Sequence, residues 1–269
     1  MNNQRLRAIA AETVTISQVG GYRTRSGTWV DIREAIRAAV ARTRLYLPGE
    51  PLPTGFSRPG GGLVEVTNES TLAAARRLGD GAAALVFASA RNPGGGFLTG
   101  ARAQEEDIAR ASALHACLRA VPAFYLHHRA HDDPRYTDRV VYSPGVPVFR
   151  DDTLRLLDRP HRTAFLTAAA PNLRALRVNQ PHLAASVPAV LRERALRVVE
   201  VAAAHGHRRL VLGAWGCGVF GNDPALVASA FTAALDRVDA FDHVVFAVLD
   251  RTPGAATYHA FAAAASTLV

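Results

Sequence analysis

The sequence predicts a three-layer α/β sandwich, with helices on both faces of a central sheet. A strand, a Gly-rich loop and a helix recur three times along the chain, as in folds that carry ligand loops at the ends of their strands. The chain has 269 residues, of which 49% are hydrophobic, enough for one large domain with a real core. A 20% share of charged residues is typical of a globular protein.

Residues 1–62 are predicted to form a helical extension followed by a linker. Residues 3–12 form a candidate helix, and the glycines within 20–27 mark turns. Residues 32–46 place apolar side chains close to helical spacing, at Ile32, Ile36, Val40 and Leu45. The many Pro and Gly residues of 48–62 indicate a linker or a long loop.

Residues 63–269 are predicted to form a second region, packed as one unit, in which strands and helices alternate. The continuous apolar run 83–88 is typical of a strand buried on both faces. Ser70 or Thr71 is a suitable N-cap for the helix after the first strand. The predicted strands are 63–66, 83–88, 140–141, 164–167, 210–212 and 243–249. The predicted helices are 71–78, 104–119, 187–204, 224–238 and 258–264.

The composition excludes several kinds of chemistry. All 31 basic residues are Arg, which rules out a Walker-type lysine loop, Schiff-base catalysis and lysine-anchored pyridoxal phosphate. The only two cysteines, Cys117 and Cys217, cannot form a cysteine-rich zinc site and suit a reducing compartment. Residues 1–11 contain no long apolar run, and no run of about 18 apolar residues occurs anywhere. We therefore expect a cytoplasmic protein with no membrane partner.

The formal net charge of +8 has two explanations that the sequence leaves open. Such a surface attracts nucleic acid or another phosphate polymer. A GC-rich genome, which favours Arg over Lys and also raises the Ala content, gives the same charge without a polyanionic partner.

The densest group of glycine and polar residues directly follows the predicted strand 83–88. Asn92, Gly94, Gly95 and Gly96 are followed, after a gap of seven residues, by Gln104, Glu105, Glu106 and Asp107. Consecutive glycines let backbone N–H groups approach a ligand, and beside a helix start they form an anion site. The helix dipole explains Asp107. For Glu105 and Glu106, the glycines upstream favour a chemical role.

A second Gly-rich loop, 213–221, follows the predicted strand 210–212 and precedes a helix that begins at Pro224. Its glycines suggest backbone amides around a diphosphate. Two such loops at the strand ends of one sheet can form opposite walls of one cleft. Phe220 is interpreted either as a ring that stacks on a ribose or base, or as a core side chain.

Together these segments resemble the signature of poly(ADP-ribose) glycohydrolases: Gly94–Gly96, a seven-residue gap, and Gln104–Glu106. The flanking segments SARNPGGGF and GAWGCGVFGNDP are similar to the microbial type of that family. The resemblance spans about residues 63–261 and implies a catalytic macrodomain, an α/β/α sandwich with a mixed central sheet. An N-terminal helical extension is also typical of the microbial type.

The resemblance further implies a role for each motif residue. Glu106 is the expected catalytic carboxylate, and Glu105 is expected to bind a ribose hydroxyl beside the scissile bond. The expected substrate-binding residues are Asn92, Gly94, Gly95, Gly96 and Gln104 in the first motif, and Gly216, Gly218, Val219, Phe220 and Gly221 in the second. The partners implied are poly(ADP-ribose) or ADP-ribosylated protein, with ADP-ribose as product. No metal or organic cofactor is expected, nucleic acid is expected only if modified, and a monomer is expected.

Cleavage of a ribose–ribose bond needs a carboxylic acid that protonates the leaving oxygen. A helix dipole lowers the pKa of a first-turn Glu, whereas burial raises it, and the sequence leaves this balance open. Three alternatives also stay open: an ADP-ribose reader that does not cleave, a hydrolase that removes single ADP-ribose units, and a nucleic-acid-binding protein.

The remaining polar clusters are interpreted as structural. The segment from His127 to Asp133 reads as a polar loop before a strand rather than a metal site, and His205 and His207 as helix-end residues. Cys217 reads as a small buried thiol. Asp250, at the end of the last predicted strand, is a candidate residue for the cleft.

Overall fold

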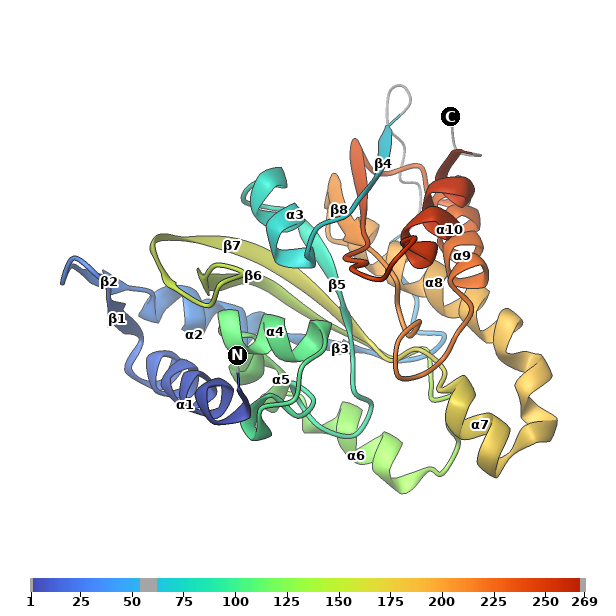
Figure 1. The fold of residues 1–269 in the computed structure, drawn as a ribbon, viewed down its shortest axis with the longest axis horizontal. Helices are drawn as coiled ribbons and strands as arrows, with labels where there is room; N and C mark the ends of the chain where they lie inside the picture. Colours follow the sequence, from blue (N-terminus) through green and yellow to red (C-terminus); the bar gives the residue numbers. More distant parts are fainter. Residues whose placement is uncertain (1, 54–61, 267–269) are drawn as a thin grey trace.

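The computed structural model describes residues 2–53 and 62–266, in which a seven-stranded mixed sheet forms the centre of the molecule (Figure 1). Its strands lie in the order β3-β6-β7-β5-β8-β9-β4. The five from β7 to β4 run parallel, whereas β6 is antiparallel to both of its neighbours, β7 and β3. The bounds are β3 Arg44–Tyr46, β4 Leu63–Thr67, β5 Ala83–Phe87, β6 Val140–Arg150, β7 Leu156–Ala168, β8 Arg209–Leu212 and β9 His243–Ala247.

Helices cover both faces of this sheet. One face carries α1 Asn3–Val19, α2 Arg33–Arg42, α3 Thr71–Leu78, α4 Gln104–Ala111, α5 Leu114–Arg119 and α6 Pro122–Ala130. The other face carries α7 Leu173–Asn179, α8 Val187–Ala204, α9 Pro224–Arg237 and α10 Ala256–Ala265. The sequence of β5 is continuously apolar because both faces of the strand are buried. Ala83 and Leu85 belong to the hydrophobic core on one side of the sheet, and Ala84 and Val86 to the core on the other side. The predicted three-layer fold is confirmed.

Several predicted elements match the structure closely. Helix α3 begins after Ser70, whose hydroxyl accepts a 3.0 Å hydrogen bond from the N–H of Ala73. Helix α8 has the predicted bounds, and α9 begins at Pro224 with Asp223 as its N-cap. The predicted linker 48–62 includes residues 54–61, which lie outside the described part of the chain.

Two predicted helix boundaries were wrong, because tertiary contacts override the local sequence pattern there. The predicted helix 104–119 breaks at Ser112, which pairs with Val148 of β6, and the N–H of Ala113 donates to the carbonyl of Pro147. The predicted helix 32–46 ends at Arg42, because residues 44–46 pair with β6 at the sheet edge. The glycine-rich turns hold a small hairpin of β1 Gly21–Arg23 and β2 Trp29–Asp31.

The order of the central strands positions the functional loops. Strands β5 and β8 are parallel neighbours, with Ala83 opposite Leu210 and Ala84 opposite Val211. The two Gly-rich loops follow these strands and therefore leave the sheet at the same edge, side by side.

Candidate active site

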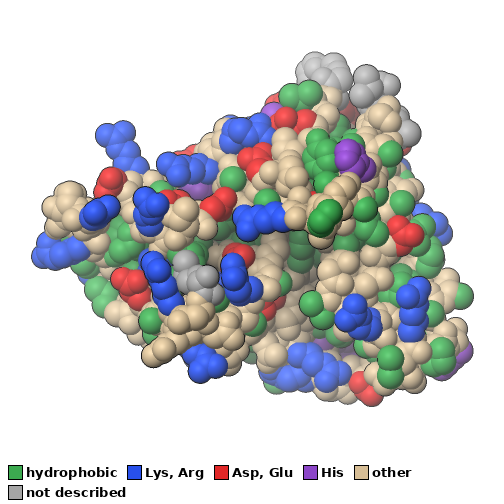
Figure 2. Space-filling model, viewed as in Figure 1, with side chains coloured by type: hydrophobic (Ala, Val, Ile, Leu, Met, Phe, Trp, Pro, Cys, Tyr) green, Lys and Arg blue, Asp and Glu red, His purple; other side chains and the backbone are tan. Residues whose placement is uncertain are grey.

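A cleft of about 770 Å³ opens at this edge of the sheet. Both Gly-rich loops line it, together with the start of α4, and Figure 2 shows a hollow in the middle of this face with Arg side chains around it. Of the residues predicted from sequence, the structure brings eight into the lining: Asn92, Gln104, Glu105, Glu106, Gly216, Gly218, Val219 and Phe220. The described residues Gly94, Gly95, Gly96 and Gly221 belong to the same loops but are not part of the lining.

The first Gly-rich loop lies directly against Glu105 and Glu106. The N–H of Gly96 donates a 2.9 Å hydrogen bond to Oε1 of Glu106, and the N–H of Gly95 donates to the carbonyl of Asn92. A side chain at Gly95 would place its Cβ 2.3 Å from Glu106 Oε1, and this residue has a φ of +58°. These two backbone donors thus act within the protein, where they shape the loop and hold the Glu106 carboxylate.

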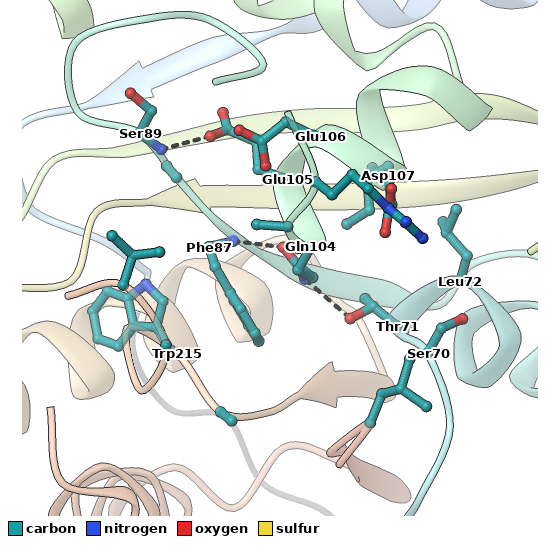
Figure 3. A pocket seen from close by; sticks show the side chains of 18 of the residues that line it. Ser70, Thr71, Leu72, Phe87, Ser89, Gln104, Glu105, Glu106, Asp107 and Trp215 are labelled. Atoms are coloured by element: carbon teal, nitrogen blue, oxygen red, sulfur yellow. Dashed lines mark hydrogen bonds between the residues drawn. The ribbon is translucent and has the colours of Figure 1, made fainter. Parts of the chain in front are cut away.

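Glu105 is almost completely buried, at 2% exposure. Its Oε2 accepts a 2.6 Å hydrogen bond from the N–H of Ser89, two residues after β5 ends (Figure 3). Its Oε1 is buried without a hydrogen-bond partner among the described residues. Burial raises the pKa of Glu105 well above its usual range, and the nearby Glu106 carboxylate adds to this effect.

Gln104 joins β5 to α3. Its Oε1 accepts a hydrogen bond from the N–H of Phe87, and its Nε2 donates to the carbonyl of Leu85 and to the hydroxyl of Thr71 (Figure 3). Since three internal bonds fix the side-chain amide, Gln104 anchors the first turn of α4, where the two glutamates lie.

The second Gly-rich loop places several unpaired backbone donors in residues that line the cleft. Among the described residues, no atom accepts a hydrogen bond from the N–H of Gly216, Gly218, Val219 or Phe220, and all four residues line the cleft. Successive free amides of this kind form a concave anion site. Gly221 has its N–H bound to the carbonyl of Gly218 and a φ of +72°, so it shapes the turn.

Contacts on both sides brace this loop. Trp215 is buried and donates from its indole N–H to the carbonyl of Ala168, 2.9 Å away. The amide of Asn222 donates to the carbonyls of Pro171 and Gly216. Gly216 has a φ of +71°, and a Cβ there would lie 2.5 Å from both the Asn222 amide nitrogen and Ala170. Only glycine fits this position without a rearrangement.

Tyr136 also lines the cleft, and sequence reasoning missed it. Its ring centroid lies 6.1 Å from that of Phe220, with an angle of 45° between the rings. Phe220 is half-buried in the wall of the cleft, which fits a ligand-facing ring better than a core one. No repeat or glycine motif marks the segment around Tyr136, so no sequence pattern identified it as a cleft residue.

Contacts within the protein account for three further residues that the sequence singled out: Asp107, Asp250 and Cys217. Asp107 also lines the cleft, but its side chain is 58% exposed and pairs with the buried Arg110 at 2.7 Å. The carboxylate of Asp250 accepts hydrogen bonds from Thr252 and from the N–H of Thr257 at the start of α10, which lowers its pKa to about 2. Burial raises the pKa of the Cys217 thiol to about 12, so the thiolate that a nucleophile requires is disfavoured.

The histidines take part in packing. His127 and His128 lie on α6, so the predicted polar loop begins only after Ala130. His205 stacks on Tyr142, with ring centroids 3.6 Å apart, and His207 bonds to the hydroxyl of Tyr142 at 2.8 Å. Within residues 2–53 and 62–266, no group of three or more His, Cys, Asp or Glu side chains could hold a metal ion. Among the helices described there, none has the length and apolar character needed to cross a membrane.

Comparisons with known proteins agree with this geometry. Residues 10–151 match the family described as microbial-type PARG, catalytic domain. The crystal structure of poly(ADP-ribose) glycohydrolase from Thermomonospora curvata is 52% identical, with a TM-score of 0.91 over 97% of this chain and 99% of that one. The same enzyme bound to the inhibitor ADP-HPD gives a TM-score of 0.88 at 52% identity, with the same coverage.

The enzyme from Deinococcus radiodurans, in complex with ADP-ribose, is 43% identical, with a TM-score of 0.81 over 89% of this chain and 100% of that one. No curated protein sequence matches the chain. The family match covers more than half of the chain, and the similarity to these structures extends over most of it. The chain belongs to the microbial-type poly(ADP-ribose) glycohydrolase family and is an enzyme that hydrolyses poly(ADP-ribose).

Proposed function

We propose that Glu106 is the general acid and base of this hydrolysis. The observation that carries the proposal is the arrangement of the cleft. Glu106 lines it with its carboxylate held by Gly96, and the free amides of Gly216, Gly218, Val219 and Phe220 line it as well. A carboxyl group and an anion site in one cleft suit a substrate with a glycosidic bond next to a diphosphate.

In the proposed reaction, Glu106 carries out both proton transfers. Glu106 protonates the oxygen that leaves the ribose, while the ribose develops oxocarbenium character. Glu106, now ionised, then takes a proton from the water that attacks the anomeric carbon, and this releases ADP-ribose. The substrate diphosphate, bound to the amides of the second loop, helps to position that water.

The remaining site residues hold the substrate in the proposal. Oε1 of Glu105, which has no partner among the described residues, is available to a ribose hydroxyl once the ligand enters. Asn92 is exposed at the cleft and is available to the same ribose, while Gly94–Gly96 act through their contacts with the two glutamates. Phe220 packs against the ribose or the adenosine of the substrate. Gln104 acts by anchoring the first turn of α4, and Gly221 by shaping the turn of the second loop.

ADP-ribosylated protein is a second proposed substrate, with the same cleft and the same acid. We also propose that the enzyme acts in the cytoplasm as a monomer. Two free thiols, Cys117 and Cys217, support a reducing location.

The test compares the wild type with Glu106→Gln and Asp107→Asn on purified poly(ADP-ribose), with released ADP-ribose as the readout. Asp107→Asn is the matched control, because it neutralises the adjacent carboxylate, which pairs with Arg110. We expect Glu106→Gln to bind ADP-ribose and to release none from the polymer, and Asp107→Asn to remain active. Equal loss in both variants would overturn the assignment of Glu106. Binding without release by the wild type would identify a reader.

A further inference from the structure

Arg194 is one of two buried arginines, with Arg197, on a helix face that is mostly apolar. It lies on α8 at 2% exposure, among buried neighbours such as Leu191 and Val198. A buried guanidinium is costly unless hydrogen bonds satisfy it. Its Nε donates to Oδ1 of Asp138 at 2.8 Å, and its Nη1 donates to the carbonyls of Arg135 and Ala169 at 2.7 and 2.8 Å. These acceptors belong to two different segments, which Arg194 ties together.

The first of these segments holds Tyr136 in a strained backbone conformation. Tyr136 has a φ of +57°, in the left-handed region that a bulky residue rarely adopts. Such strain persists only where the surroundings fix it, and it is concentrated at functional sites. Arg194 bonds to Arg135, directly before Tyr136, and to Asp138, two residues after it. The Tyr136 ring is thereby directed into the cleft, in contact with Phe220.

The second segment connects to the loop that carries the free amides. Ala169 follows β7, and the chain after it contacts both walls of the cleft. The N–H of Asn172 donates to the carbonyl of Pro134 at 2.8 Å, and the N–H of Arg174 donates to the carbonyl of Phe220 at 2.9 Å. The backbone of Phe220 and the backbone of Tyr136 are therefore held by one hydrogen-bonded unit with Arg194 at its centre.

This unit explains why the two rings meet. They lie 6.1 Å apart at 45°, which is a side-by-side contact that leaves no room for a ligand between them. They form one continuous aromatic wall of the cleft. Resting on the proposed function, we propose that Tyr136 extends the surface of Phe220 against bound ADP-ribose, and that Arg194 is the positioning residue that holds it there.

The first measurement is the Kd of ADP-ribose by calorimetry for Tyr136→Phe and Tyr136→Asn. Asn tolerates the left-handed conformation, so this variant removes the ring and keeps the backbone. We expect Tyr136→Asn to bind on the order of tenfold more weakly, as for the loss of an aromatic contact. Tyr136→Phe should keep the wild-type Kd, because the ring remains. Unchanged binding by Tyr136→Asn would overturn the role of Tyr136.

The second measurement tests the coupling of Arg194 to Tyr136. We expect Arg194→Met to weaken ADP-ribose binding by the same factor as Tyr136→Asn, and the double variant to lose no more than either one alone. Leu191→Ala is the matched control, since it removes a buried side chain from the same face of α8 and should lower the melting temperature without changing Kd. If Arg194→Met does not fold, Asp138→Ala, which removes the ionic partner, takes its place.

The outcomes separate this inference from the proposed function. A wild type that fails to bind ADP-ribose refutes the proposed function itself. A wild type that binds, together with additive losses in the double variant or an equal loss in Leu191→Ala, refutes only the role of Arg194. Non-additive losses confined to Arg194, Asp138 and Tyr136 support it.

Discussion

The backbone N–H of Gly96 donates a 2.9 Å hydrogen bond to Oε1 of Glu106, and this bond joins the first Gly-rich loop to the start of α4. The loop has no room for a side chain at Gly95, because that position faces the Glu106 carboxylate. The position of the proposed catalytic acid therefore depends on the conformation of a loop ten residues earlier in the sequence.

Gly95→Ala should impair hydrolysis more than folding. The new Cβ would lie 2.3 Å from Glu106 Oε1, the end of a flexible side chain, so the carboxylate must move. We expect the rate of ADP-ribose release to fall on the order of a hundredfold, as when a reacting group is misplaced by about 1 Å. Gly206→Ala is the control: it has a similar φ of +72°, with no described atom within 4 Å of the added Cβ. If both variants lost activity equally, backbone strain rather than displacement of Glu106 would be the cause.

Glu105→Gln should stabilise the ligand-free protein, increasingly so as the pH rises. Because the folded-state pKa of Glu105 is raised by burial, the folded state retains a proton that the unfolded state releases above its ordinary pKa. Wild-type stability therefore falls with rising pH in that range, whereas a neutral Gln has no such dependence and can still accept from Ser89. Melting temperatures from pH 4 to pH 8 test this, and parallel curves for the two proteins would contradict it.

His128→Gln should reduce the loss of stability in acid. His128 is 1% exposed, and burial lowers its pKa from 6.5 to about 4. Below pH 6.5 the unfolded state binds a proton that the folded state cannot bind until about pH 4, so wild-type stability falls across this window. Gln can keep the hydrogen bond to Thr137 without titrating. We expect a shallower decline of melting temperature from pH 6.5 to pH 4 in the variant, and an unchanged slope would show that other groups dominate.

Asp250→Ala should lower stability and leave catalysis intact. Its carboxylate accepts from Thr252 and from the start of α10, so its loss leaves those N–H groups without their cap. We expect a lower melting temperature and wild-type release of ADP-ribose from the polymer. If the variant melted at the wild-type temperature but released less ADP-ribose, Asp250 would have a role in the reaction rather than a structural one.

Local pattern was sufficient to predict much of the fold. The apolar run of β5 and the long helix α8 are readable because burial demands a continuous or periodic apolar pattern. The pattern was misleading at Ser112 and at residues 44–46, where pairing with β6 replaced the helical preference. Such pairing joins residues far apart in sequence, so no local signal records it.

For the site, the sequence by itself determined which groups are present: two glycine loops, Glu105, Glu106 and Phe220. Only the tertiary structure decided how their hydrogen bonds are used. The first loop binds Glu106 through Gly96, whereas four residues of the second loop line the cleft with N–H groups that no described atom accepts. Tyr136 lines the cleft, and Arg194, from a distant helix, bonds to the backbone before it and to Asp138 after it. The physical reason is that a backbone N–H has the same chemistry in every residue, and packing alone decides where it points.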